Sequence, residues 1–216
     1  MDRRQREFEA RRGAILDAAR QVIADLGVEN ATMEEIASSA DYTRRTVYSY
    51  FQNRDEVLLT ILVEDLAARW QEQQTAMAGE KTGLAELLAW GRTFLNYLVQ
   101  HPHSLELQAY WDFRGLDPNR ISSGTFDQFK ELNEAVASGL REAFALGMAD
   151  GSLRPDLEVD LCLSQYIYSL RAVLNRALSS AYSFASFEPA EYVESFLELL
   201  VRGIGSPGES VDWRAW

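Results

Sequence analysis

Three helix starts that lie close together near the N-terminus constrain the fold of this chain more than any other feature. Thr32 followed by Glu35, and Asn53 followed by Glu56, are capping boxes, in which polar side chains satisfy the free N–H groups of a first helical turn. Thr43 lies between them and can cap a third helix. Short helices joined by a tight turn are typical of a helix-turn-helix, whose second helix presents its exposed face to the major groove of DNA.

The third of these helices has one face that can pack and one that suits DNA. Val47, Tyr50 and Phe51 are spaced to pack inward. The other face offers arginine donors for guanine edges, hydroxyl groups for phosphates and a threonine methyl group for thymine. The residues of this outward face are Arg44, Arg45, Thr46, Tyr48 and Ser49.

Helical periodicity continues along the rest of the chain. Apolar residues three and four positions apart predict a first helix that ends at Gly27, a connecting helix over about 54–76, and further helices up to about residue 202. We find no strand candidate. The predicted fold is therefore all-α with about nine helices.

The acidic net charge of −12 would argue against a nucleic-acid ligand if it were evenly spread. Residues 1–55, however, contain nine arginines against ten acidic residues, a net charge of −1, and the remaining residues hold the other −11. Local arginine clusters can form a DNA footprint that the overall sum hides. One cluster consists of Arg3, Arg4, Arg6, Arg11 and Arg12, for which we weigh a frayed N-terminus against an arm that follows the DNA.

The single cysteine, Cys162, excludes an internal disulfide and suits a reducing compartment. No apolar stretch reaches about 18 residues, and the charged N-terminus does not resemble a signal peptide. We therefore expect a soluble, cytoplasmic protein with no membrane partner.

The run from Thr32 to Leu58 resembles the signature of TetR-family transcriptional regulators, with its aromatic pair and its acidic start of the fourth helix. The resemblance implies base contacts from Arg44, Arg45 and Thr46. It also implies phosphate contacts, from Thr32, Thr43, Tyr48, Tyr50 and Arg54. Two residues depart from the family pattern: Asp41 replaces the usual glycine of the turn, and Gln52 replaces a common lysine. Aspartate tolerates a left-handed backbone better than most residues, whereas Gln52 removes one charge for phosphate.

The same resemblance implies a DNA-binding domain at 1–55, a ligand-binding and dimerisation domain at 56–204, and a tail at 205–216 whose Trp213 and Trp216 have no predicted role. It further implies a repressor that binds double-stranded, palindromic operator DNA and that a small apolar or aromatic effector releases. Aromatic residues on the helices that surround the family's pocket are candidates for lining it, although such residues are also ordinary core. They are Trp90, Phe94, Tyr97, Tyr110, Trp111, Phe126, Phe129 and Tyr166.

The last two helices are apolar enough to form a homodimer interface. The penultimate helix is apolar almost all round, as expected of a helix that its own core covers on one side and a partner on the other. The predicted interface residues are Tyr166, Leu170, Val173, Leu174, Tyr192, Phe196, Leu199 and Leu200.

Two other functions remain open. An enzyme would need a reactive constellation, and His101, His103 and Glu106 are the best imaginable metal ligands, although a helix boundary explains them better. We expect no enzymatic activity and no cofactor. The second alternative is a regulator of the same fold that has no small-molecule effector and that responds to a protein or acts as an activator.

Overall fold

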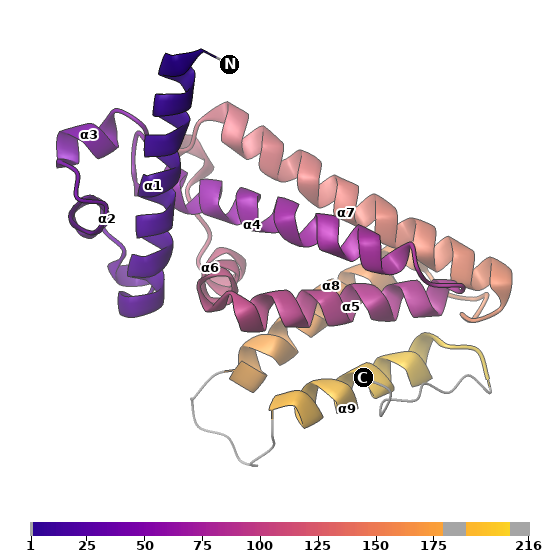
Figure 1. Ribbon diagram of the computed structural model, residues 1–216. Helices are drawn as coiled ribbons and strands as arrows, with labels where there is room; N and C mark the ends of the chain where they lie inside the picture. Colours follow the sequence, from indigo (N-terminus) through magenta and orange to yellow (C-terminus); the bar gives the residue numbers. More distant parts are fainter. Residues whose placement is uncertain (1, 179–188, 208–216) are drawn as a thin grey trace. The chain divides into compact units, whose positions relative to one another are not determined.

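The computed structural model describes residues 2–178 and 189–207 (Figure 1). Within these ranges the chain forms nine α-helices and two short 3-10 turns, and its only β-type pairing is an isolated bridge between Leu153 and Gly205. The predicted all-α fold with about nine helices is therefore confirmed. Trp213 and Trp216 lie outside the described residues.

The helices follow one another with short connections. In chain order they are α1 (Arg3–Leu26), α2 (Met33–Ser39), α3 (Arg44–Tyr48), α4 (Arg54–Met77), α5 (Gly83–Gln100), α6 (Pro102–Phe113), α7 (Ser123–Asp150), α8 (Val159–Leu178) and α9 (Pro189–Ile204). The 3-10 turns are η1 (Val28–Asn30) and η2 (Pro118–Arg120). None of the helices in the described ranges has the length and apolar character that crossing a membrane requires.

The predicted helix starts are confirmed by their caps. The Thr32 hydroxyl accepts the N–H of Glu35 at 3.2 Å, and the Asn53 side-chain oxygen accepts the N–H of Glu56 at 3.0 Å. Both contacts satisfy donors that a first helical turn leaves free. The Glu56 carboxylate completes the second cap by accepting the backbone N–H of Gln52 at 2.8 Å.

The chain divides into two compact units. The first contains 1–68 and 98–132, and the second contains the described residues of 69–97 and those from 133 onward. Helices α4, α5 and α7 therefore each contribute to both units. The first unit includes α6 and the start of α7 as well as the predicted DNA-binding segment 1–55, whose functional boundary stays a prediction.

The core of the first unit joins α1 to the three helices that follow it. Ile15 and Ile23 of α1, Ile36 of α2, Val47 of α3 and Leu58 of α4 are all fully buried in one apolar cluster. Because each of the two short helices is too small to bury its own apolar face, this shared cluster fixes their positions.

The second unit depends on a close approach between the start of α5 and the end of α7. A Cβ atom added to Gly83 would clash with the backbone of Gly147 and Ala143, so only glycine allows the approach. The Gly83 N–H donates to Asp150 Oδ2 at 2.8 Å, and the Leu84 N–H donates to the Ser152 hydroxyl at 3.2 Å. These side chains cap α5 and hold it against the turn that follows α7.

Candidate nucleic-acid interface and buried aromatic cluster

Helices α2 and α3 form the predicted helix-turn-helix. The turn between them closes with a hydrogen bond from the Tyr42 N–H to the Ala37 carbonyl at 2.9 Å. Asp41 has a φ of 55°, the left-handed conformation that its place in the turn requires. Aspartate thus takes the position of a glycine without loss of the turn.

The surface of α3 carries most of the residues predicted to contact DNA. Thr46 and Tyr50 are half-buried, and the rest are exposed: Thr32, Thr43, Arg44, Arg45, Tyr48 and Ser49. The Thr43 hydroxyl caps α3 by accepting the Thr46 N–H at 3.1 Å. The Ser49 hydroxyl donates to the Thr46 carbonyl at 2.6 Å. These hydroxyls are held by the helix, so the exposed side of α3 is ordered before any ligand is bound.

The two arginines at the start of α3 have different surroundings. Arg44 forms an ion pair with Glu34 of α2, and both side chains are exposed. Arg45 is exposed and makes no ion pair within the described part of the chain. Arg45 can therefore reach a ligand directly, whereas Arg44 must exchange one partner for another.

Arg54 is the predicted DNA residue whose surroundings differ most from our expectation. Its guanidinium donates through Nε to the Ala31 carbonyl at 2.8 Å and through Nη2 to the Val28 carbonyl. The ring of Tyr110 lies 5.5 Å from its guanidinium carbon. Arg54 thus connects the start of α4 with the segment before α2 and with α6, a structural role that capping signals alone could not predict.

The N-terminal arginines lie on α1, which begins at Arg3 with Asp2 as its cap. They are therefore not a frayed end, and that they follow the DNA stays a prediction. The Phe8 ring packs on the Tyr50 ring with a centroid distance of 4.7 Å, so this part of α1 is anchored beside the end of α3. The guanidinium of Arg12 lies 5.4 Å from the Phe51 ring centre.

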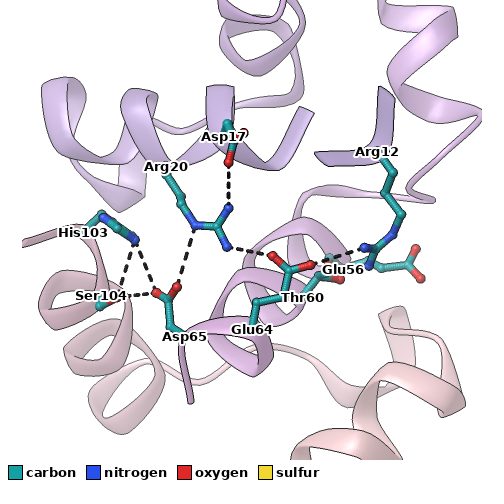
Figure 2. A network of polar contacts seen from close by, with 9 residues as sticks. All are labelled: Arg12, Asp17, Arg20, Glu56, Thr60, Glu64, Asp65, His103 and Ser104. Atoms are coloured by element: carbon teal, nitrogen blue, oxygen red, sulfur yellow. Dashed lines mark hydrogen bonds and ion pairs between the residues drawn. The ribbon is translucent and has the colours of Figure 1, made fainter. Parts of the chain in front are cut away.

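A polar network joins α1, α4 and α6 (Figure 2). Arg20 of α1 pairs with Glu64 of α4 at 2.7 Å and lies 3.7 Å from Asp65. His103 Nε2 of α6 lies 3.3 Å from Asp65, and the Ser104 hydroxyl donates to the same carboxylate. Burial raises the pKa of Asp65, but the hydrogen bonds from His103 and Ser104 and the nearby charges outweigh it, so the net pKa is lowered.

The imagined metal ligands take part in other contacts. His103 belongs to the network of Asp65, and Glu106 Oε1 accepts the Val28 N–H at 2.6 Å. His101 is the N-cap residue of α6, directly before Pro102. Among the described residues, no group of three or more histidine, cysteine or acidic side chains is arranged to hold a metal ion.

The eight aromatic residues predicted to line a ligand pocket are divided between the two units. Half of them pack against the core of the first unit: Tyr110, Trp111, Phe126 and Phe129. The other half are buried in the second unit: Trp90, Phe94, Tyr97 and Tyr166. Helical spacing shows which residues face inward, but it does not show which core they join.

The aromatic residues of the second unit form one cluster, which we call the α5 aromatic cluster (Trp90, Phe94, Tyr97 and Tyr166). The Trp90 and Phe94 rings stack at 5.3 Å with an interplanar angle of 8°, and the Tyr166 ring lies 5.4 Å from Trp90. The Tyr166 hydroxyl donates to the Leu87 carbonyl. Burial raises the pKa of Tyr166, so this hydroxyl keeps its proton.

Two polar residues of α4 that the sequence analysis missed reach this cluster. The guanidinium carbon of Arg69 lies 4.6 Å from the Phe94 ring centre and 5.9 Å from that of Tyr97. Gln73, one turn later, donates its amide to the Trp90 carbonyl at 3.3 Å. Polar residues four positions apart on the inward stripe of a helix are the signal that could have identified them.

The predicted dimer residues also fall into two groups. Tyr166, Leu170 and Leu174 are buried within the chain itself, which removes them from any surface that a second copy could cover. Val173 of α8 is half-buried. On α9 the predicted residues lie along an outer stripe that is half-buried or exposed: Tyr192, Phe196, Leu199 and Leu200. The opposite stripe of α9 is buried in the second unit through Val193, Leu197 and Val201.

Comparison with known proteins places residues 15–61 in the family described as "Bacterial regulatory proteins, tetR family". One relative is the HTH-type transcriptional repressor KstR2 of Mycolicibacterium smegmatis, 26% identical over 153 residues, which are 70% of this chain and 72% of the relative. Another is the HTH-type transcriptional regulator UidR of Escherichia coli, 24% identical over 165 residues, or 73% of this chain and 76% of the relative.

Solved structures share the fold over most of the chain. The superposition with the fatty acid degradation regulator FadR from Bacillus halodurans covers 89% of this chain and 95% of the FadR chain, with a TM-score of 0.71 and 20% identity. The superposition with the ketosteroid transcriptional regulator KstR2 of Mycobacterium tuberculosis covers 91% of this chain and 95% of the KstR2 chain, with a TM-score of 0.66 and 17% identity. At these identities the likeness establishes the fold.

Proposed function

Because this chain belongs to the TetR family of bacterial regulatory proteins, a family of DNA-binding transcription regulators, we propose that it is a repressor that binds a palindromic operator as a homodimer and is released by a small apolar or aromatic ligand. The protein would act in the cytoplasm, where a chromosomal operator lies. The observation that carries the proposal is the exposed face of α3. Arg44 and Arg45 are exposed on this face, while the other side of the helix packs in the apolar core of the first unit.

The proposed DNA contacts follow from exposure and chemistry. Arg44, Arg45 and Thr46 read base edges, since they occupy the first turn of the recognition helix. The phosphate contacts come from exposed or half-buried hydroxyl groups, which fix the register without reading sequence. They are Thr32, Thr43, Tyr48, Ser49 and Tyr50. Arg54 is assigned to holding the domain together, because its guanidinium donates to two backbone carbonyls.

The proposed dimer uses the outer stripe of α9. Leu199 is 66% exposed although the opposite stripe of the same helix is buried, so α9 is apolar on two sides. A second copy covering this stripe by two-fold symmetry would bury it in both subunits. A two-fold dimer that binds successive major grooves would recognise a palindrome whose half-sites are about 34 to 36 Å apart.

The proposed effector binds in the second unit, at the α5 aromatic cluster. Stacked aromatic side chains suit a largely apolar ligand. The relatives add support, since KstR2 is described as a ketosteroid regulator and FadR from Bacillus subtilis was solved in complex with stearoyl-CoA. Both descriptions name a molecule with a large apolar body, a ketosteroid in one and a stearoyl chain in the other.

The experiment that tests the proposal is selection of bound duplexes from a random DNA pool by the full chain. A two-fold symmetric consensus whose half-sites are one helical turn apart supports a dimeric operator-binding regulator. Absence of any sequence preference refutes it. Release of the selected duplex in a metabolite screen then tests ligand control, and a regulator that no small molecule releases would contradict that part alone.

A further inference from the structure

Two polar atoms beside the α5 aromatic cluster have no hydrogen-bond partner within the described part of the chain. They are the side-chain oxygen of Gln73 and the indole nitrogen of Trp90. Both side chains are buried, with 0% and 2% of their surface exposed. Leaving a buried polar atom unpaired destabilises the fold, and folded proteins rarely do so in two residues that are hydrogen-bonded to each other.

The orientation of the Gln73 amide is determined by its neighbour. Its nitrogen donates to the Trp90 carbonyl at 3.3 Å, and a carbonyl can only accept. Exchanging the amide oxygen and nitrogen would place two acceptors against each other, so the oxygen must be the unpaired atom. The indole of Trp90 is a donor only. Together they offer one acceptor and one donor.

Tyr166 packs on the Trp90 ring without pairing with either atom, and its hydroxyl donates to the Leu87 carbonyl. A Cβ atom on Gly91 would lie 2.7 Å from that hydroxyl, so the packing fixes Tyr166 in this position. The stacked Trp90 and Phe94 rings supply an apolar surface next to the polar pair.

We propose that Gln73 and Trp90 recognise the polar end of the effector, and that this end is a neutral group that both donates and accepts a hydrogen bond, such as a hydroxyl on an apolar ring system. The proposal rests on ligand control as part of the proposed function. A hydroxyl donates to the Gln73 oxygen and accepts from the Trp90 indole. A carboxylate only accepts, so it could pair with the Trp90 indole but would leave the Gln73 oxygen without a donor, and an ether likewise cannot donate.

The test uses the full chain and four probes with one carbon skeleton: 2-naphthol, 2-methoxynaphthalene, naphthalene and 2-naphthoate. Calorimetry measures their dissociation constants. We expect 2-naphthol to bind about tenfold more tightly than the other three, since it alone makes both hydrogen bonds. The ¹H–¹⁵N signal of the Trp90 indole, identified as the one missing in Trp90→Phe, should move downfield with 2-naphthol and not with naphthalene. Equal affinities, no binding of any probe, or an unmoved indole signal overturns the proposal.

Gln73→Met is the decisive variant, because methionine keeps the length of the side chain and removes its hydrogen-bonding groups. The variant should bind naphthalene within about twofold of the wild type and lose the preference for 2-naphthol. Without ligand its melting temperature should change little, since removal of an unpaired buried oxygen offsets loss of the hydrogen bond to the Trp90 carbonyl.

Gln108→Met is the matched control. Gln108 is also buried and also donates its amide, to Asp112 at 3.1 Å, but in the ranges that the structure describes it has no unpaired buried atom, so its replacement should lower the melting temperature and leave the probe preference intact. If a buried water alone satisfies Gln73 and Trp90, Gln73→Met will lower the melting temperature as the control does and the wild type will show no preference for 2-naphthol, which overturns the proposal.

The DNA selection separates this proposal from the proposed function. Gln73→Met should select the same palindrome as the wild type, because Gln73 lies in the second unit. A wild-type protein that selects a palindrome but shows no preference for 2-naphthol disproves the polar recognition alone. A wild-type protein that selects no sequence disproves the regulator itself, whatever the probes do.

Discussion

Replacing Asp65 by asparagine tests whether the network of Figure 2 stabilises the first unit. Asp65 is the carboxylate at its centre, and its side chain is only 6% exposed. Asparagine keeps the shape and one acceptor oxygen, so the hydrogen bond from Ser104 can persist in neutral form. The negative charge that faces Arg20 at 3.7 Å and His103 at 3.3 Å is lost.

The size of the effect follows from these contacts. A hydrogen bond to a charged group contributes about 1.5 to 3 kcal/mol, and a neutral one about 1 kcal/mol. Removing one partner of a buried pair also leaves the other insufficiently paired, and costs about 3 to 5 kcal/mol when burial is complete. Arg20 is partly exposed and keeps Glu64, so we expect a loss of about 2 to 4 kcal/mol. This corresponds to a decrease in melting temperature of about 4 to 16 °C for a chain of this size.

The measurement is thermal unfolding followed by circular dichroism at several pH values. Because the pKa of Asp65 is lower in the folded protein than in the unfolded chain, its ionised form stabilises the fold above about pH 4. That stabilisation is lost as the pH falls through the lowered folded-state pKa. The melting temperatures of the wild type and Asp65→Asn should therefore differ most near neutral pH and converge below about pH 4.

Asp17→Asn is the matched control. Asp17 pairs with the same Arg20 at 3.1 Å, but its side chain is 79% exposed. An exposed ion pair contributes about 0 to 1 kcal/mol, so this variant should unfold almost as the wild type does. The reasoning is refuted if Asp65→Asn costs no more than Asp17→Asn, or if the difference from the wild type grows as the pH is lowered.

Three further predictions concern DNA contact, dimer formation and the turn. Arg45→Ala should weaken operator binding by about 1 to 3 kcal/mol and relax readout at one base position without changing the melting temperature. Arg54→Ala should instead lower the melting temperature, because two carbonyls lose a charged donor. The opposite pattern in binding and melting assays would contradict both assignments. Leu199→Glu should sediment as a monomer at micromolar concentration. The control Leu26→Glu, at a leucine that is 47% exposed on α1, should sediment with the same mass as the wild type. A dimeric Leu199→Glu rules out the α9 interface. Asp41→Gly should stabilise the fold by about 0.5 to 1 kcal/mol in denaturant titrations, because glycine adopts a φ of 55° without steric cost. A decrease in stability would show that the aspartate side chain stabilises the turn by more than its backbone strain costs.

The helix-turn-helix could be predicted from sequence because its determinants are local. A cap such as Thr43 with Thr46 lies within one helical turn, and its effect does not depend on the rest of the chain. The same holds for Asp41, whose short polar side chain suits a left-handed residue. Local rules therefore gave both the helix starts and the outward face of α3.

The sequence did not predict which side of α9 is exposed or which unit each aromatic residue belongs to. Helical spacing identified Leu170 and Leu199 as apolar positions, yet one is fully buried in its own subunit and the other is 66% exposed. Which apolar face a helix turns inward depends on the helices packed against it, and these are distant in sequence. The same limit applies to Trp111 and Trp90, which belong to different units.

The grouping of α6 with the N-terminal unit depends on polar side-chain pairs of long sequence separation as well as on its apolar residues Leu107, Tyr110 and Trp111, which pack in the core of that unit. Glu106 of α6 accepts the Val28 N–H of η1, and Arg114, the residue that caps α6, pairs with Glu29 of the same turn at 2.8 Å. Ser104 donates to Asp65 of α4. Each contact joins a polar group on α6 to a helix or turn more than 35 residues earlier in the chain, and none belongs to an apolar stripe. Hydrophobic periodicity, which locates helices, therefore could not reveal that α6 is fastened to the helices that carry the DNA-binding surface.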